Sequence, residues 1–138
     1  MPSEKDHFVR SATVRRVLDG DTVELDVDLG FNVYIRQTVR MQGYNAGETR
    51  SKDALEKQAG DSAKSALQAL LPQGTACTVK TSKPCNDVYG RFVAEIWVGP
   101  VSVNKRMLET SPVVPYDGKT SRAALQTDWA AVLVSNSQ

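Results

Sequence analysis

Alternating hydrophobic and polar residues predict that the chain opens with a β-hairpin. Residues 8 to 18 form the first predicted strand, and the dipeptide Asp19-Gly20 is typical of a tight turn that leads straight into a second strand. In that second strand, apolar residues alternate with acids: Val23, Leu25, Val27 and Leu29 lie on one face, and Glu24, Asp26 and Asp28 lie on the other. The pattern is that of a strand with one face in the core and one in water.

Asp21 falls on the inward, apolar phase of this strand. A carboxylate in that position is either a capped turn residue or a ligand at the mouth of a barrel. On the turn alone, the turn residue is the better interpretation, since aspartate is common in such turns.

After Leu29-Gly30, a third strand is expected to run to Met41. One phase of its period-2 pattern holds Phe31, Val33, Ile35, Val39 and Met41, and the other holds Tyr34, Arg36, Thr38 and Arg40. The pattern therefore places Arg40 off the core face, where it can meet an anion. Glu48 follows in a glycine-bearing loop, so a cation, carboxylates and a possible metal ligand occur within one supersecondary unit, as phosphate chemistry requires.

Residues 53–71 predict an amphipathic helix. Its apolar stripe consists of Leu55, Ala59, Ala63, Ala66, Leu67, Leu70 and Leu71. Asp53 and Glu56 have the spacing of a capping box, while Pro72 and Gly74 end the helix. Gly60 interrupts the pattern at about 1 kcal/mol relative to alanine, which indicates a close helix-to-sheet contact or an irregular first turn.

The second half of the chain predicts two more strands and two short helices. The strands cover residues 76–81 and 89–98, separated by a loop at 82–88. A short extended run at 101–103 precedes a helix at 104–109, a proline-bracketed segment ends near Tyr116, and a last helix is expected at 121–134. Three strands, a helix and two strands give the order of an OB-fold: an α+β domain with a five-stranded antiparallel barrel and about three helices.

The chain is expected to form a single domain over residues 1–138. Residues 1–7 should be loose, and 119–138 should form a C-terminal helix and tail. The 138 residues include 17 Lys plus Arg against 16 Asp plus Glu, so net charge does not indicate a nucleic-acid partner and any such function must come from a local site. Without an apolar leader or a membrane-length segment, we expect a soluble protein, cytoplasmic or secreted after loss of a leader.

Histidine and cysteine chemistry is sparse. Cys77 and Cys85 lack zinc-site spacing and are expected to be reduced thiols, and the sole histidine, His7, lies in the polar N-terminal segment. Mechanisms that need a histidine base or several histidine ligands are therefore disfavoured.

Three motifs together resemble the signature blocks of the staphylococcal-nuclease (thermonuclease) family. They are D-G-D-T at 19–22, V-R-M-Q-G-Y-N-A-G-E-T at 39–49 and D-V-Y-G-R at 87–91, in the family's order and at similar spacings. The likeness extends from about residue 13 to about residue 118. Each block is weak by itself, but unrelated surface charges would not reproduce all three.

The resemblance implies a calcium-dependent phosphodiesterase on an OB-fold scaffold, acting on DNA and RNA so that the 5′ oxygen leaves. By motif position, Asp21 and Asn45 would hold Ca²⁺ together with the main-chain carbonyl of Ala46. Glu48 would be the general base that activates or orients the attacking water.

The same resemblance assigns the substrate contacts. Arg40 and Arg91 would bind the phosphate and stabilise charge in the transition state, since guanidinium groups match phosphate oxygens in pairs. Tyr89 and Tyr116 would line the substrate cleft. The three charged residues Arg40, Glu48 and Arg91 are expected to converge beside the barrel mouth. The protein is expected to be a monomer that favours single-stranded DNA or RNA and does not bind membranes.

The sequence departs from the family at two positions. Asn45 stands where the family usually has aspartate, and Gly47 where it usually has proline. An asparagine offers calcium an amide oxygen but no charge. Gly47 gives the loop that carries Glu48 more freedom in the unfolded chain.

Two other functions fit parts of the sequence. The first is an OB-fold module that binds nucleic acid without cutting it; the presence of Arg40, Glu48 and Arg91 argues against it. The second uses Asp117-Gly118-Lys119 as the D-x-K motif of a magnesium-dependent restriction-type nuclease, but this motif lies in a proline-bounded turn with no evident acidic partner.

Overall fold

The computed structural model describes residues 8–86, 91–116 and 127–136, and the side chains of all of these except 82–86 and 136. In chain order the elements are β1 (Val9–Asp19), β2 (Thr22–Asp28), β3 (Tyr34–Met41), β4 (Tyr44–Asn45), α1 (Ala54–Leu70), β5 (Ala76–Asn86), β6 (Phe92–Val98), β7 (Val101–Ser102), α2 (Val103–Thr110), β8 (Val114–Pro115) and α3 (Trp129–Asn136).

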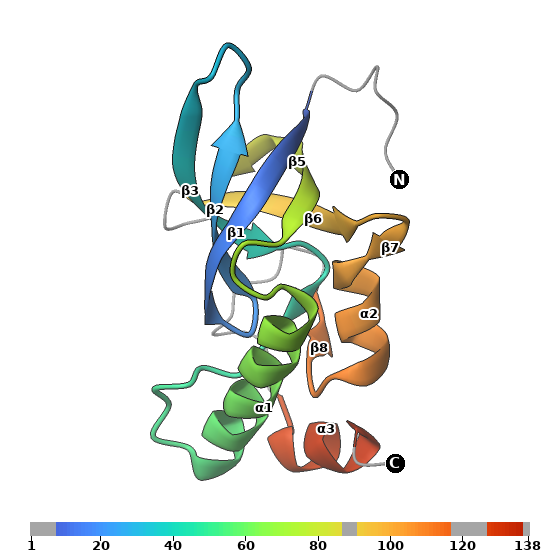
Figure 1. The fold of residues 1–138 in the computed structure, drawn as a ribbon. Coiled ribbons are helices and arrows are strands. Elements are labelled where there is room, and N and C mark those ends of the chain that lie inside the picture. Colours follow the sequence, from blue (N-terminus) through green and yellow to red (C-terminus); the bar gives the residue numbers. More distant parts are fainter. Residues whose placement is uncertain (1–7, 87–90, 117–126, 137–138) are drawn as a thin grey trace.

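The main sheet closes into a barrel. Its strand order is β3-β2-β1-β5-β6-β7, and β3 also pairs with β6, which joins the two sides (Figure 1). That closing pair is parallel, with Val39, Arg40 and Met41 opposite Phe92, Val93 and Ala94. The predicted OB-fold with three helices is confirmed, with a barrel that is mixed rather than wholly antiparallel because of this one parallel pair.

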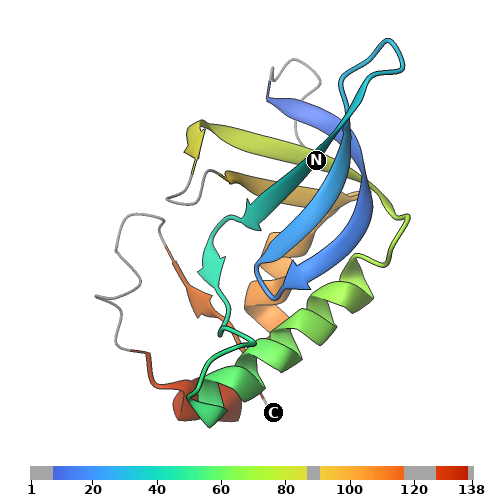
Figure 2. The same cartoon turned by 90° about the vertical axis from the view of Figure 1, so that its left-hand side faces the viewer.

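The core lies inside the barrel and extends to α1, which runs beneath one barrel end (Figure 2). The inward residues Val23 and Leu25 of β2 are buried as the alternation predicts, and Leu67 of α1 and Met107 of α2 close the core from below. The predicted helix at 53–71 is confirmed as α1, with the Asp53 carboxylate accepting the N–H groups of Leu55 and Glu56 at its N-terminus. Leu55 itself is exposed, so the apolar stripe begins one turn later than predicted.

The inward phase predicted for the start of the third strand is wrong. β3 begins at Tyr34. Phe31 at the hairpin tip is fully exposed, and Val33 and Ile35 are exposed as well. The β1 pairing with β2 ends at Ala12–Val27, and β6 reaches only Val39–Met41 of β3, so the β2–β3 hairpin projects beyond the barrel. The alternation continues there, but among the described residues β1 and β6 do not extend along it, and its apolar side chains are exposed.

Later elements differ in extent. β5 continues to Asn86, through most of the predicted loop, and α3 begins at Trp129, while residues 121–126 of the predicted last helix lie outside the described residues. A small antiparallel pair that was not predicted joins β4 to β8. His7, Tyr89 and the segment 117–119 lie outside the described residues, as does the side chain of Cys85. In the described part of the chain, no helix is long and apolar enough to cross a membrane.

Candidate active site

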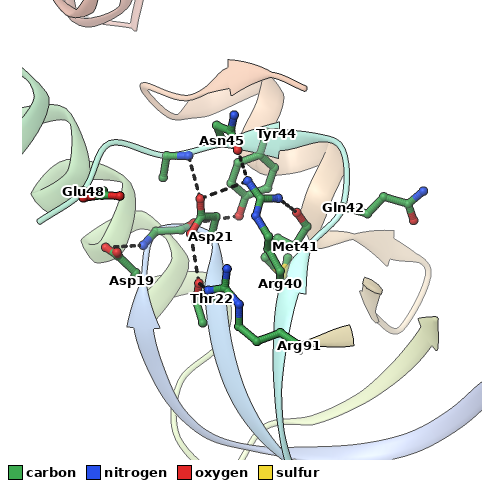
Figure 3. Close-up of polar contacts among 12 residues, drawn as sticks. Asp19, Asp21, Thr22, Arg40, Met41, Gln42, Tyr44, Asn45, Glu48 and Arg91 are labelled. Atoms are coloured by element: carbon green, nitrogen blue, oxygen red, sulfur yellow. Dashed lines mark hydrogen bonds and ion pairs between the residues drawn. The ribbon is translucent and has the colours of Figure 1, made fainter. Parts of the chain in front are cut away.

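Asp21 is fixed at the end of the barrel by contacts on every side. Its main-chain carbonyl accepts the N–H of Met41 at 2.8 Å, which ties the β1–β2 turn to the end of β3. Its carboxylate accepts the Thr22 hydroxyl at 3.1 Å on one oxygen and the Ala46 N–H at 3.1 Å on the other. The inward phase thus places a buried carboxylate next to the loop that follows β4 (Figure 3).

Arg40 lies at the centre of this group. Its guanidinium pairs with the Asp21 carboxylate at 3.5 Å and donates hydrogen bonds to the side-chain oxygen of Asn45 and, at 3.1 Å, to the carbonyl of Met41. The aromatic ring of Tyr116 lies 5.3 Å from the guanidinium carbon, a distance suited to a cation–π contact. Arg40 is therefore largely buried and held in one orientation.

Thr22 connects Arg91 to Asp21. The Arg91 guanidinium donates to the Thr22 hydroxyl oxygen at 3.3 Å, and that hydroxyl donates in turn to the Asp21 carboxylate. Arg91 precedes β6 and Arg40 lies in β3, so the parallel β3–β6 pair brings the two arginines together from distant parts of the sequence. In Figure 3 the Arg40 guanidinium lies against Asp21, and that of Arg91 lies beside the adjacent Thr22.

Glu48 lies on the other side of Asp21 from the arginines (Figure 3). Its backbone N–H donates to the Glu56 carboxylate at 2.9 Å, so Glu56 binds the loop rather than completing the predicted capping box with Asp53. The pKa of the Asp19 carboxyl is raised, first by burial, then by the negative charge of Asp21 and, less strongly, by that of Glu48. Asp19, Asp21 and Glu48 therefore share one electrostatic environment.

Tyr44 supports the turn from below. Its side chain is fully buried, and its hydroxyl donates to the carbonyl oxygen of Gly20 at 2.8 Å. Burial raises the pKa of this phenol well above its ordinary value, an effect increased by Asp21 and opposed by Arg40. The hydroxyl is therefore a permanent donor to Gly20 at neutral pH.

The donors of the site are hard oxygen atoms. Asp21 contributes a carboxylate and Asn45 an amide oxygen, and both contact the Arg40 guanidinium, so they lie close to one another. Oxygen donors of this kind fit Ca²⁺ or Mg²⁺ rather than zinc. Over the described residues, however, no three His, Cys, Asp or Glu side chains form a group that could hold a metal ion, so a metal here would need backbone, water or substrate oxygens as well.

Several contributors were not identified from the sequence. Thr22 and Tyr44 lie within two of the three recognised motifs, and their hydrogen bonds depend on partners that only folding brings near. Glu56 showed no signal beyond the predicted cap. Ala46 contributes its N–H to Asp21, while its carbonyl was the group expected to meet a metal.

The family model of staphylococcal nuclease homologues matches residues 38–122, more than half of the chain. No curated protein shows significant similarity to it.

Proposed function

The chain belongs to the staphylococcal nuclease homologue family, and from this premise we propose that it is a calcium-dependent nuclease that hydrolyses phosphodiester bonds in DNA or RNA. Family membership supports a nuclease-like function in general. The specific reaction, the metal and the residue roles below are our proposal.

One observation carries the proposal. Arg40 from β3, Arg91 from the start of β6 and Asp21 from the β1–β2 turn meet at one end of the barrel, although 70 residues of sequence separate Asp21 from Arg91. Two arginines beside a buried aspartate form a site with both a phosphate-binding and a cation-binding part. Such a grouping suits the attack of water on a phosphodiester, because the negative charge on the phosphate oxygens increases in the transition state.

The arginines would bind the scissile phosphate. A guanidinium has five N–H donors, and the contacts of Arg40 with Met41, Asn45 and Asp21 use at most three of them, so Arg40 can bind phosphate oxygens while its hydrogen bond to the Met41 carbonyl anchors it. Arg91, held at Thr22, would approach the same phosphate, and the Tyr116 ring would border it. Tyr89 is proposed as a second contact from the sequence alone.

Glu48 would take a proton from the attacking water as the water oxygen bonds to phosphorus; the P–O5′ bond then breaks, and the leaving 5′ oxygen takes a proton from solvent. Asp21, Asn45 and the Ala46 carbonyl would hold the metal, which supplies positive charge to the phosphate when bound. Glu48 is exposed, unlike Asp21, so water reaches it readily. Its position depends on the loop backbone rather than on burial of its own side chain.

The test measures cleavage of labelled single-stranded DNA and RNA in calcium, in magnesium and in chelator. We expect calcium-dependent cleavage, and rates about 100- to 1,000-fold lower for Glu48→Ala, Arg40→Lys and Arg91→Ala. Lysine is chosen for Arg40 because it keeps a positive charge beside the buried Asp21 carboxylate while removing the planar fork.

Arg36→Ala is the matched control. Arg36 lies on the same face of β3 as Arg40, but it is exposed and pairs loosely with Asp26 at 3.9 Å, so its loss should leave cleavage unchanged. A folded variant of Glu48, Arg40 or Arg91 that cuts at the wild-type rate would remove that residue from the mechanism. Binding of single strands with no cleavage in any metal would instead support the non-catalytic binding module.

A further inference from the structure

We propose that helix α1 positions Glu48 through a backbone contact between Gly47 and Gly60, completed by the Glu56 carboxylate. This inference rests on the proposed role of Glu48. It adds Gly60 and Glu56, both in α1, as positioning residues for the reaction.

The contact between the loop and the helix is closer than any side chain permits. A Cβ atom on Gly60 would meet the carbonyl oxygen of Gly47 well inside van der Waals distance, with the Gly47 carbonyl carbon at 2.8 Å and the Glu48 carbonyl carbon at 3.1 Å. A Cβ atom on Gly47 would meet the Glu56 carbonyl oxygen in the same way, with the Gly60 nitrogen at 3.1 Å. Both glycines are buried, so each leaves room for the backbone of the other.

The presence of a glycine at position 60, inside the continuous helix α1, thus has a specific cause. The contact is with the Glu48 loop, not with the sheet. It also accounts for Gly47: any residue with a Cβ atom at this position would collide with the α1 backbone. Gly47 lacks the rigidity of the proline that is usual at this position, but its backbone packs directly against α1, which restrains the loop before Glu48.

Glu56 adds a directional restraint. Its carboxylate accepts the Glu48 N–H at 2.9 Å, one turn before Gly60 on the same helix. The loop is therefore held at two successive backbone units, by packing at Gly47 and by a hydrogen bond at Glu48. Since the Glu48 side chain is exposed, these two contacts replace the side-chain packing that normally orients a catalytic group.

The α1 surface also supports the opposite side of the site. A Cβ atom on Gly20 would lie 2.7 Å from the Ala63 Cβ and 2.8 Å from the Ala46 Cβ. Gly60 and Ala63 lie three residues apart on one helix face. A single rigid helix therefore contacts both the turn that carries Asp21 and the loop that carries Glu48, which sets the position of one relative to the other.

The test combines cleavage kinetics with a measurement that does not depend on activity. The test compares three variants, Gly60→Ala, Glu56→Ala and Glu56→Gln, with the control Ser65→Ala. Ser65 is an exposed residue of α1, and its replacement by alanine raises helix propensity without affecting the loop. For each protein, kcat and KM on single-stranded DNA and the ¹⁵N order parameter of the Glu48 amide are measured.

We expect Gly60→Ala and Glu56→Ala to lower kcat about 10- to 100-fold with KM changed less than about threefold, because a shift of about 1 Å in a catalytic group has effects of this size. In Glu56→Ala the Glu48 order parameter should fall from about 0.85 to below about 0.6, while barrel amides keep their values. Glu56→Gln retains a carbonyl acceptor and should restore both quantities, and Ser65→Ala should change neither.

Wild-type kcat in folded Gly60→Ala and Glu56→Ala would overturn the proposal. An unchanged Glu48 order parameter in Glu56→Ala would also overturn it, and this measurement can be made even if Gly60→Ala does not fold. If the wild-type protein cuts no substrate, the proposed function fails, and the order parameters then decide by themselves whether α1 holds the loop.

Discussion

Replacing Asn45 by aspartate is expected to strengthen calcium binding to the free protein. Asn45 is only 6% exposed and Asp21 8%, and both side chains contact the Arg40 guanidinium. In the proposed metal site, the wild type would present one carboxylate to a dication, with Asn45 adding a neutral oxygen. A second carboxylate at this position increases the negative charge without altering the shape of the side chain.

The magnitude follows from the burial of the site. Two unit charges 4 Å apart attract by about 1 kcal/mol in water and by about 4 kcal/mol at an effective dielectric constant of about 20. In the free variant, Arg40 pairs with the new carboxylate, and this pairing weakens when the metal binds. The net gain should therefore be about 1 to 3 kcal/mol, or about 5- to 150-fold in the calcium dissociation constant.

The same variant should reduce the coupling between metal and substrate. In the wild type, a phosphate oxygen is expected to supply the missing negative charge, so calcium and nucleic acid each strengthen the binding of the other by an equal factor. With Asn45→Asp the metal has a second carboxylate, and the added charge repels the phosphate. The factor should become smaller.

Calorimetric titration of calcium, with and without a non-cleavable dinucleotide, measures both effects. Gln42→Glu is the matched control: Gln42 is exposed and points away from Asp21 in Figure 3, so the added charge is screened by solvent and should change affinity less than about twofold. Tight calcium binding by the free wild type, or no gain in Asn45→Asp, would refute the reasoning.

Two further predictions concern buried groups of the barrel. Tyr44→Phe removes the donor to the Gly20 carbonyl and should lower the free energy of unfolding, measured in urea, by about 1 to 3 kcal/mol. The control, Tyr34→Phe in the exposed hairpin, should lower it by less than about 0.5 kcal/mol. Equal losses in the two variants would contradict the role of the Tyr44 hydroxyl. Burial raises the pKa of the Cys77 thiol from 9.0 to about 11, so the unfolded chain loses this proton first and stability should fall by up to about 3 kcal/mol as pH rises from 9 to 11. Denaturation of Cys77→Ala over the same range should lack this component, and an identical pH slope in both proteins would rule the thiol out.

Much of the fold follows from local patterns. The alternation in β2 predicts its buried face, the turn at Asp19-Gly20 predicts the first hairpin, and the Asp53 cap together with Pro72 predicts α1. These features depend on residues near one another in the chain, where backbone geometry and solvent exposure decide the outcome. The recognition of Asp21, Arg40 and Glu48 as candidates came from motifs of the same short range.

Contacts between distant segments could not be predicted in this way. The exposed face of Phe31 and Val33 has the same alternation as a buried strand, and what distinguishes it is that, in the described part of the chain, β1 and β6 stop short of it. Glu56 has the spacing of a capping residue, yet its carboxylate binds the Glu48 backbone because the loop folds back onto α1.

The sequence by itself therefore proposed candidates for phosphate chemistry, and it placed Arg40 on a strand and Asp21 in the turn before one. Tertiary structure alone decided that Arg40 pairs with Asp21 while Arg91 reaches the adjacent Thr22, through the parallel β3–β6 pair, and that Gly47 and Gly60 pack backbone to backbone. The physical reason is that strand phase and helix caps are set by neighbours in sequence, whereas barrel closure and glycine packing depend on how closely separate backbones approach.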